Sequence, residues 1–322
     1  MANDALDSRI DPDLLPIIQS QRDRMASRPP LHEVTPAMMR DRAAAEFVVW
    51  NADPLPLHSV QDFTISHDSH AVPVRLYEPV AGLTGPLVVH FHGGGWTIGS
   101  PQLEDASTRL LAQRANLRIL SVDYRLSPEF PFPAPLEDGV AVLSWLSDRP
   151  DRLAVDPDRI AVCGASAGAN VALGTMLRLR DAGRPLPARL VLLYGAYLGH
   201  NDTPSHEAYG DGNVGLSSAA MDYFWHNYTG VENDLRHPHA VPIKADLSGL
   251  PPVFLNHSGL DVLADDTILL AQKLREAGVD VTHHEYPGAI HGFTQYVKGC
   301  ALAREAMCTT ADWLAAALGS HD

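Results

Sequence analysis

The chain has 322 residues, of which 45% are hydrophobic and 20% are charged, a composition of globular rather than disordered or fibrous proteins. Its 39 acidic and 24 basic residues give a net charge of −15, which repels phosphate, so we expect neither nucleic acid nor a membrane as a partner. Three unpaired cysteines, no secretory signal and no apolar run near the ~18 residues of a membrane span predict a soluble cytoplasmic protein.

Residues 1–55 predict helical segments. Asp11-Pro12 and Thr35-Pro36 are helix-start signals, because Thr caps a helix and Pro suits its first position. The first helix would carry the apolar residues Leu14, Leu15, Ile17 and Ile18, and the second would carry Met38, Met39, Phe47 and Val48.

From residue 60 onward, strands and helices alternate. Two short β-rich runs, 62–67 and 72–79, precede strands predicted at 87–92, 119–123, 160–163, 190–194, 253–256 and 281–286. Helices are predicted at 103–115, 135–147, 167–181 and 265–277. Several strands are continuous apolar runs, which is typical of strands buried on both faces. The sequence therefore predicts an α/β fold, with a central, mostly parallel, eight-stranded sheet flanked by helices.

Residues 198–240 interrupt this alternation. They contain many polar residues and glycines, no good strand, and one aromatic helix predicted at 217–228. An insertion of this size at the carboxyl edge of the sheet is well placed to cover an active site. Four large side chains of the helix share one face: Met221, Phe224, Trp225 and Tyr228. This face either packs onto the core or lines a substrate pocket, for which Trp96, Phe224 and Trp225 are our candidates.

Residues 164–168 match the pattern G-x-S-x-G between a predicted strand and a predicted helix. This strand–turn–helix setting presents a nucleophilic serine on a tight turn, where larger neighbours would collide with the strand and the helix. A glycine-rich turn without catalytic function would have a similar composition. We predict that Ser166 is a nucleophile, and its place at a helix N-terminus favours a developing anion.

His92-Gly93-Gly94-Gly95-Trp96 follows the strand predicted at 87–92. Glycines let the backbone bend close to a substrate and turn N–H groups toward it. A phosphate-binding loop is the other use of such glycines, but the chain is acidic and has no Gly-x-x-x-x-Gly-Lys-Ser/Thr pattern. We therefore predict that the amides of Gly93 and Gly94, with that of Ala167, form an oxyanion hole.

A serine nucleophile needs a base and an orienting carboxylate, which in this architecture follow it in the order Asp/Glu, then His. His291 follows the last predicted strand and Asp261 follows the strand before it, so both lie at the edge where Ser166 projects. Asp265 and Asp266 are rival acids, but they suit the first turn of a helix, where the dipole favours them.

Two pairs of histidines, His237 with His239 and His283 with His284, could suggest a metal site. Such neighbours point apart on a strand, and the chain has neither a His-Glu-x-x-His motif nor paired cysteines. We therefore expect no metal, and serine-based hydrolysis needs no cofactor.

Together these motifs resemble the hormone-sensitive-lipase-like (family IV) carboxylesterases of the α/β-hydrolase superfamily, from about residue 60 onward. Five further segments carry the resemblance: DYRLSPE at 123–129, FPAPLED at 132–138, LPP at 250–252, KLREAG at 273–278 and IHGF at 290–293. The resemblance implies the α/β-hydrolase fold with a helical cap, and a homodimer.

The resemblance also implies how the chain is divided and what its residues do. Residues 1–55 and 198–240 would form the two parts of the cap, and 56–197 and 241–322 the catalytic core. Ser166, Asp261 and His291 correspond to the family's triad, and Gly93, Gly94 and Ala167 to its oxyanion donors. Two positions depart from the family pattern: Ala165 stands where the family has Asp, and Val262 where it has Pro.

The expected function is therefore that of a serine carboxylesterase acting on small-molecule esters with short to medium acyl chains. An amidase, a lactonase or a deacetylase could use the same residues. A true lipase is a further alternative, but the absence of a secretion signal and of a long apolar lid helix favours short, soluble esters over insoluble triglyceride. A non-catalytic small-molecule receptor on this fold would have lost a triad residue, whereas all three are present here.

Overall fold

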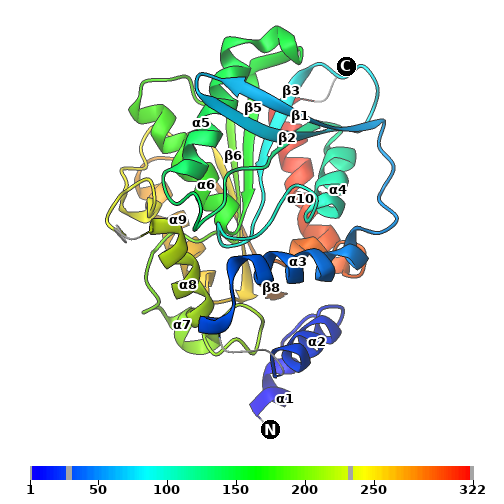
Figure 1. Cartoon of the computed structure of the whole chain (residues 1–322), viewed down its shortest axis with the longest axis vertical. Helices are drawn as coiled ribbons and strands as arrows, with labels where there is room; N and C mark the ends of the chain where they lie inside the picture. The colour runs from blue at the N-terminus through cyan, green and yellow to red at the C-terminus, as the bar shows by residue number, and fades with distance from the viewer. Residues whose placement is uncertain (1, 27–30, 231–234, 320–322) are drawn as a thin grey trace.

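The computed structural model describes residues 2–26, 31–230 and 235–319. At its centre is one eight-stranded sheet in the order β1-β2-β4-β3-β5-β6-β7-β8 (Figure 1). The strands are β1 (Ser59–His67), β2 (His70–Glu78), β3 (Gly85–Phe91), β4 (Arg118–Val122), β5 (Val155–Ala165), β6 (Arg189–Leu193), β7 (Val253–Leu260) and β8 (Val281–Ile290). The β1–β2 and β2–β4 pairs are antiparallel and all other pairs are parallel. The predicted α/β fold with a mostly parallel eight-stranded sheet is confirmed.

Helices cover both faces of this sheet. One face carries α5 (Ala134–Asp148), α6 (Ala167–Asp181) and α9 (Ala264–Glu276), and the other carries α4 (Asp105–Ala115) and α10 (Ala301–Leu318). The sequence did not lead us to predict α10. Adjacent residues of β3 show why two layers are needed, since Val89 is buried in one apolar core and Val88 in the other.

The segments at 1–55 and 198–240 supply the remaining α-helices. The first contains α1 (Ala2–Asp7), α2 (Leu15–Ala26) and α3 (Pro36–Asn51), and the second contains α7 (Pro204–Tyr209) and α8 (Ser218–Thr229). Short 3₁₀ turns are η1 (Leu31–Glu33), η2 (Pro150–Arg152), η3 (Pro242–Lys244) and η4 (Phe293–Tyr296). The two segments meet, because Arg22 donates to the Asn213 carbonyl at 2.7 Å. Arg9 also donates to the Tyr209 hydroxyl at 2.7 Å.

Local signals set the starts of these helices, with one correction. Thr35 caps α3 by accepting a hydrogen bond from the Met38 amide, and Ser217 caps α8 in the same way. The helix predicted to begin at Asp11-Pro12 begins instead at Leu15. Asp11 is occupied in a turn, because its side chain accepts from the Asp13 amide and its carbonyl from the Leu14 amide.

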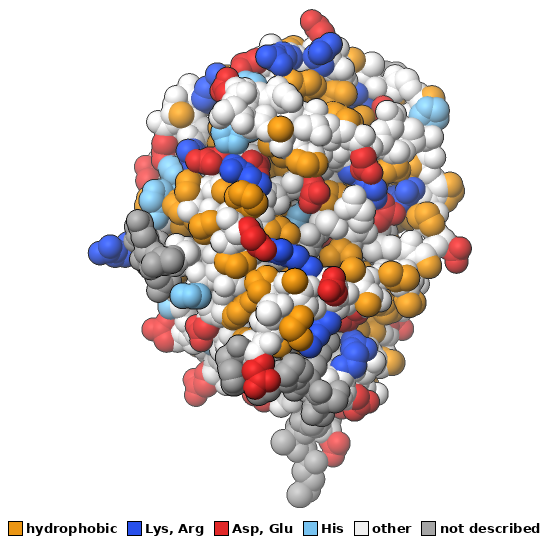
Figure 2. Space-filling view, viewed as in Figure 1, with side chains coloured by type: hydrophobic (Ala, Val, Ile, Leu, Met, Phe, Trp, Pro, Cys, Tyr) orange, Lys and Arg blue, Asp and Glu red, His pale blue; other side chains and the backbone are white. Residues whose placement is uncertain are grey.

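The surface in Figure 2 carries acidic and basic side chains interspersed among apolar ones. No helix within the described ranges combines the length and apolar character needed to cross a bilayer.

The tightest turn of the core joins β5 to α6. Ser166 lies there with φ 52° and ψ −121°, a conformation that a non-glycine residue keeps only when its surroundings hold it. A Cβ on Gly164 would lie 2.2 Å from the Gly168 carbonyl oxygen, and a Cβ on Gly168 would lie 2.1 Å from that of Phe91. Glycine at both positions lets β5, α6 and the end of β3 approach closely enough to hold the turn.

Replacing Gly168 with alanine tests this close approach. The added Cβ would meet two backbone oxygens, of Phe91 at 2.1 Å and of His92 at 2.3 Å. We expect Gly168→Ala to lower the free energy of unfolding by ~3 kcal/mol. Gly183→Ala is the control, because its φ of +66° is strained but nothing lies within 4 Å of an added Cβ; it should cost ~1 kcal/mol. Urea denaturation measures both, and equal losses would contradict the packing argument.

Candidate active site

Ser166, His291 and Asp261 form one hydrogen-bonded chain. The Ser166 Oγ lies 2.8 Å from His291 Nε2, and His291 Nδ1 lies 2.7 Å from Asp261 Oδ2. Residues predicted from three separate motifs are thus brought together. This geometry lets the imidazole accept a proton from the serine hydroxyl while the carboxylate fixes the other ring nitrogen.

The ends of neighbouring strands bring the three side chains together. Asp261 directly follows β7, and His291 directly follows β8. These strands are parallel and place Leu260 opposite Ile290, so the next residue of each strand emerges at the same point of the sheet edge. Ser166 reaches this edge from the β5–α6 turn.

Asp261 is a buried carboxylate with both oxygens in use. Its relative exposure is 1%, and its Oδ1 accepts a hydrogen bond from the Leu263 amide at 3.0 Å. Such a group must be hydrogen-bonded to remain in the interior. The amide holds one oxygen, and the other therefore faces His291.

The rival acids have different partners. Asp265 Oδ2 accepts from the Ser205 amide at 2.8 Å. Asp266 Oδ1 accepts from the amides of Tyr197 and Leu198 at 2.6 and 2.9 Å. Burial raises the pKa of Asp266 to about 7, although these two amides oppose the shift. Asp265 thus joins α9 to α7, and Asp266 joins α9 to the segment after β6. Neither carboxylate makes a hydrogen bond to His291 among the described residues.

Residues 92–95, here named the glycine loop, lie beside Ser166. His92 is fully buried, its Nδ1 lies 2.8 Å from the Gly93 carbonyl, and its ring stacks on Tyr124 with centroids 4.2 Å apart. Burial lowers the pKa of His92 to about 4, so the imidazole is neutral at physiological pH and its Nδ1 donates to that carbonyl. A side chain on Gly94 would collide with the Ile98 carbonyl oxygen, because an added Cβ would lie 2.3 Å from it.

The amide of Gly93 has a different role from the one expected. It donates to Glu104 Oε1 at 2.8 Å, so it is not free to bind a substrate oxygen. By contrast, the amides of Gly94, Gly95 and Ala167 donate to no residue in the part of the chain that the structure describes. The expectation for Gly93 is therefore corrected, whereas Gly95, which the sequence did not lead us to select, has an unused amide in the cavity wall.

A cavity of about 480 Å³ has Ser166, Ala167 and His291 in its wall. Both of the segments at 1–55 and 198–240 line it. Most of its lining is apolar, from Met25, Leu31, Val34, Met39 and Phe47 on one side and Leu216, Met221 and Phe224 on the other. Such a lining suits an uncharged organic substrate.

Of the three aromatic candidates, Phe224 lines this cavity, whereas Trp96 and Trp225 are not in its wall. Trp96 is fully buried and stacks on Tyr228 with centroids 4.3 Å apart, and Trp225 lies 4.5 Å from the Trp96 ring. The two tryptophans pack α8 onto the core. The Phe224 ring covers Gly95, where an added Cβ would lie 2.3 Å from the ring.

One histidine of each predicted pair, His239 and His283, lies within hydrogen-bond distance of a residue outside that pair. His239 lies 2.8 Å from Asp181. His283 Nε2 lies 2.9 Å from Nδ1 of His257, and burial lowers the pKa of His283 to about 4. Neither arrangement adds a third ligand among the described residues.

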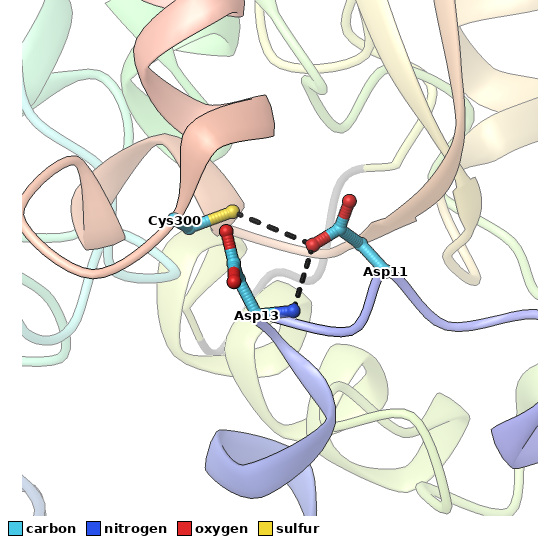
Figure 3. A group of neighbouring side chains, drawn as sticks. All are labelled: Asp11, Asp13 and Cys300. Carbon is cyan, nitrogen blue, oxygen red and sulfur yellow. Dashed lines mark hydrogen bonds between the residues drawn. The ribbon is translucent and has the colours of Figure 1, made fainter.

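One other group of described side chains could hold a cation by distance alone: Asp11, Asp13 and Cys300 (Figure 3). Its atoms already have partners in the protein. Asp11 Oδ1 accepts from the Asp13 amide at 2.9 Å and from Cys300 Sγ at 3.9 Å. Asp13 Oδ2 accepts from the Ala301 amide at 2.9 Å. These contacts fasten the N-terminal segment to the start of α10.

Comparison with known proteins shows the family of this chain. A family model described as the alpha/beta hydrolase fold matches residues 88–295. The carboxylesterase NlhH of Mycobacterium tuberculosis is 35% identical over 258 residues, which cover 78% of this chain and 81% of NlhH. An arylesterase of Saccharolobus solfataricus is 34% identical over 239 residues, 74% of this chain and 78% of the relative.

Solved structures give the same result. A hyperthermophilic esterase from the archaeon Pyrobaculum calidifontis superposes with a TM-score of 0.90 at 34% identity, over 95% of this chain and 98% of that one. With this fold, these relatives and the hydrogen-bonded Ser166, His291 and Asp261, the chain belongs to the hormone-sensitive-lipase-like esterases of the α/β-hydrolase family and is a carboxylic ester hydrolase.

Proposed function

We propose that this enzyme hydrolyses esters with short to medium acyl chains through a Ser166–His291–Asp261 triad and an acyl-enzyme intermediate. The observation that carries the proposal is the hydrogen-bonded chain from Ser166 Oγ to Asp261 in the wall of an apolar cavity.

In the first half-reaction, Ser166 Oγ attacks the ester carbonyl carbon while His291 Nε2 takes the hydroxyl proton. The new C–O bond pushes an electron pair onto the carbonyl oxygen, and Asp261 stabilises the imidazolium through Nδ1–H. The tetrahedral intermediate then collapses, the bond to the alcohol breaks, and His291 gives its proton to the leaving alcohol.

The second half-reaction repeats these steps with water. His291 Nε2 takes a proton from a water molecule, whose oxygen attacks the acyl carbon of the Ser166 ester. Collapse of the second tetrahedral intermediate breaks the bond to Ser166 Oγ, which recovers the proton from His291. The carboxylic acid leaves.

The developing oxyanion would be bound by the amides of Gly94, Gly95 and Ala167. All three are unused within the described chain, and Gly95 and Ala167 lie in the cavity wall with Ser166. Ala167 is also the first residue of α6, where the helix dipole favours negative charge.

Substrate size would be set by a cap made of residues 1–55 and 198–240, since both segments line the cavity. About 480 Å³ is ample for an acyl chain of several carbons and small for a triglyceride. The net charge of −15 favours neutral esters over anionic ones at long range.

The decisive experiment compares the wild type with Ser166→Ala on p-nitrophenyl acetate, butyrate, octanoate and palmitate. We expect turnover to be fastest on the shorter chains and to fall at least ~10⁴-fold in the variant, because no other group replaces the nucleophile. Ser144→Ala, on α5 away from the cavity, is the control and should retain full activity. A folded wild type that is inert on all four esters but active on amides or lactones would overturn the ester assignment.

Asp261→Asn tests the orienting carboxylate. An amide at this position favours the wrong imidazole tautomer, so we expect kcat to fall by ~10⁴ with little change in KM. Asp265→Asn serves as the matched control, since this neighbouring acid bonds the Ser205 amide instead. Steady-state kinetics on p-nitrophenyl butyrate would refute the assignment if the two variants lost activity equally.

Phe224→Ala tests the acyl boundary. Removing the ring enlarges the cavity beside Gly95, and each additional buried methylene contributes ~0.8 kcal/mol. We expect the ratio of kcat/KM for octanoate over acetate to rise by at least ~10-fold. Tyr223→Ala, the adjacent aromatic residue outside the cavity wall, should leave that ratio unchanged. An unchanged ratio in Phe224→Ala would show that the acyl chain lies elsewhere.

A further inference from the structure

Behind the glycine loop lies a buried carboxylate that the triad does not use. Glu104 immediately precedes α4 and is 5% exposed. Its Oε1 accepts two hydrogen bonds, from the Gly93 amide at 2.8 Å and from Gln295 Nε2 at 3.3 Å. One oxygen atom therefore joins the glycine loop to the segment that follows His291.

The second oxygen of Glu104 faces a buried histidine. Oε2 lies 3.3 Å from His90 Nε2, and His90 Nδ1 lies 3.1 Å from Ser121 Oγ. Burial alone would raise the pKa of Glu104, but the interaction with His90, foremost its hydrogen bond, together with the Gly93 amide outweighs burial and lowers it. The carboxylate is thus ionised in the folded enzyme, and charged acceptors form the stronger hydrogen bonds.

This arrangement repeats that of Asp261. Each buried carboxylate is held by one backbone amide and one imidazole, Leu263 and His291 for Asp261, and Gly93 and His90 for Glu104. For Asp261 the result is an oriented base. Glu104 in turn holds the backbone of the glycine loop through the Gly93 amide.

Fixing the Gly93 amide constrains the donors that follow it. A Cβ built at Gly93 would lie 3.2 Å from both the Ala165 carbonyl oxygen and Glu104 Oε1, and 3.4 Å from the Ser166 Cβ. The loop therefore lies between the carboxylate and the nucleophile turn. If Glu104 were absent, the Gly93 peptide could rotate, and the amides of Gly94 and Gly95 would rotate with it.

Gln295 extends the same constraint to the other side of the site. It belongs to η4 (Phe293–Tyr296), four residues after His291, and lines the cavity. Through Glu104 the loop that carries the amides is held at a fixed position relative to the segment that carries the base.

We propose that Glu104 is a positioning residue for ester hydrolysis, which holds the glycine loop with its Gly94 and Gly95 amides directed at the oxyanion. This inference rests on the proposed function, because it presumes that an oxyanion forms on attack by Ser166. The role acts on the transition state and not on the ground state, so its loss should affect kcat more than KM.

The test compares Glu104→Ala and Glu104→Gln on p-nitrophenyl butyrate. Removing an oxyanion donor costs ~10²–10³-fold in rate, and displacing donors should cost somewhat less. We expect Glu104→Ala to lower kcat by ~10–100-fold with KM within about twofold. Glu104→Gln keeps an oxygen for the Gly93 amide and should recover most of that loss.

A transition-state analogue separates positioning from general destabilisation. An aryl trifluoromethyl ketone adds the Ser166 Oγ to its carbonyl carbon, transfers the serine proton to His291, and leaves an anionic oxygen at the donors. Its inhibition constant should weaken in Glu104→Ala by the same factor as kcat/KM, whereas the inhibition constant of a neutral alcohol product should not change.

Asp138 provides the matched control. It is a buried carboxylate that accepts a backbone amide at the same distance, 2.8 Å from the Arg125 nitrogen, but outside the cavity wall. Asp138→Ala and Asp138→Asn should lower the melting temperature and leave kcat and the analogue's inhibition constant within about twofold. If Glu104→Ala does not fold, the near-isosteric Glu104→Gln and Gln295→Ala carry the same comparison, with smaller expected losses of ~3–10-fold in kcat.

Two results would overturn different conclusions. Folded Glu104 variants whose kcat and analogue inhibition stay within twofold of the wild type would overturn the inference and leave the proposed function intact, provided that Ser166→Ala is inactive. Hydrolysis that persists in Ser166→Ala would overturn the proposed function itself.

Discussion

The close approach of three backbones around Ser166 is the constraint on which the rest of the structure depends. Gly168 lies against the Phe91 carbonyl, and Gly164 lies against that of Gly168, so β3, β5 and α6 pack without side chains between them. The glycine loop directly follows Phe91. The packing that holds Ser166 at a positive φ therefore also brings this loop, with its unused amides, next to Ser166. One contact positions two parts of the site, which explains why their motifs occur together.

The two buried carboxylates near Ser166, Asp261 and Glu104, are stabilised in the same way. A carboxylate taken out of water is costly unless hydrogen bonds replace its hydration. Asp261 and Glu104 each obtain one backbone amide and one imidazole nitrogen, at 3.0 and 2.7 Å for Asp261 and at 2.8 and 3.3 Å for Glu104. Because the amides belong to the loops that form the site, the bonds that satisfy these charges also fix those loops. Stability and geometry are supplied by the same interactions.

The sequence was most informative where function depends on local pattern and strand order. The sheet, the β5–α6 turn at Ser166 and the loops of Asp261 and His291 follow from apolar runs, small residues and the rule that parallel strands end at one edge. The sequence was less informative about partners across the fold. It could not tell which of three successive glycines gives its amide to Glu104, so Gly93 was expected to bind an oxyanion although its amide is already used. Residue type likewise does not distinguish Phe224 in the cavity wall from Trp96 and Trp225 behind it.

The departure at position 165 takes on a different meaning once Glu104 is located. From the sequence, Ala165 looks like the loss of a carboxylate beside the nucleophile. In the fold, Ala165 shares a buried core with Cys163 and Tyr194. Burial is the main cause that raises the pKa of the Cys163 thiol and of the Tyr194 phenol, and the charge of Glu104 is the second. The electrostatic field of Glu104 therefore already reaches this core. A second carboxylate at 165 would add a like charge to the same desolvated region and push one of the two acids toward its neutral form. Alanine avoids that repulsion, and Glu104, at the start of α4, is the carboxylate that contacts the glycine loop.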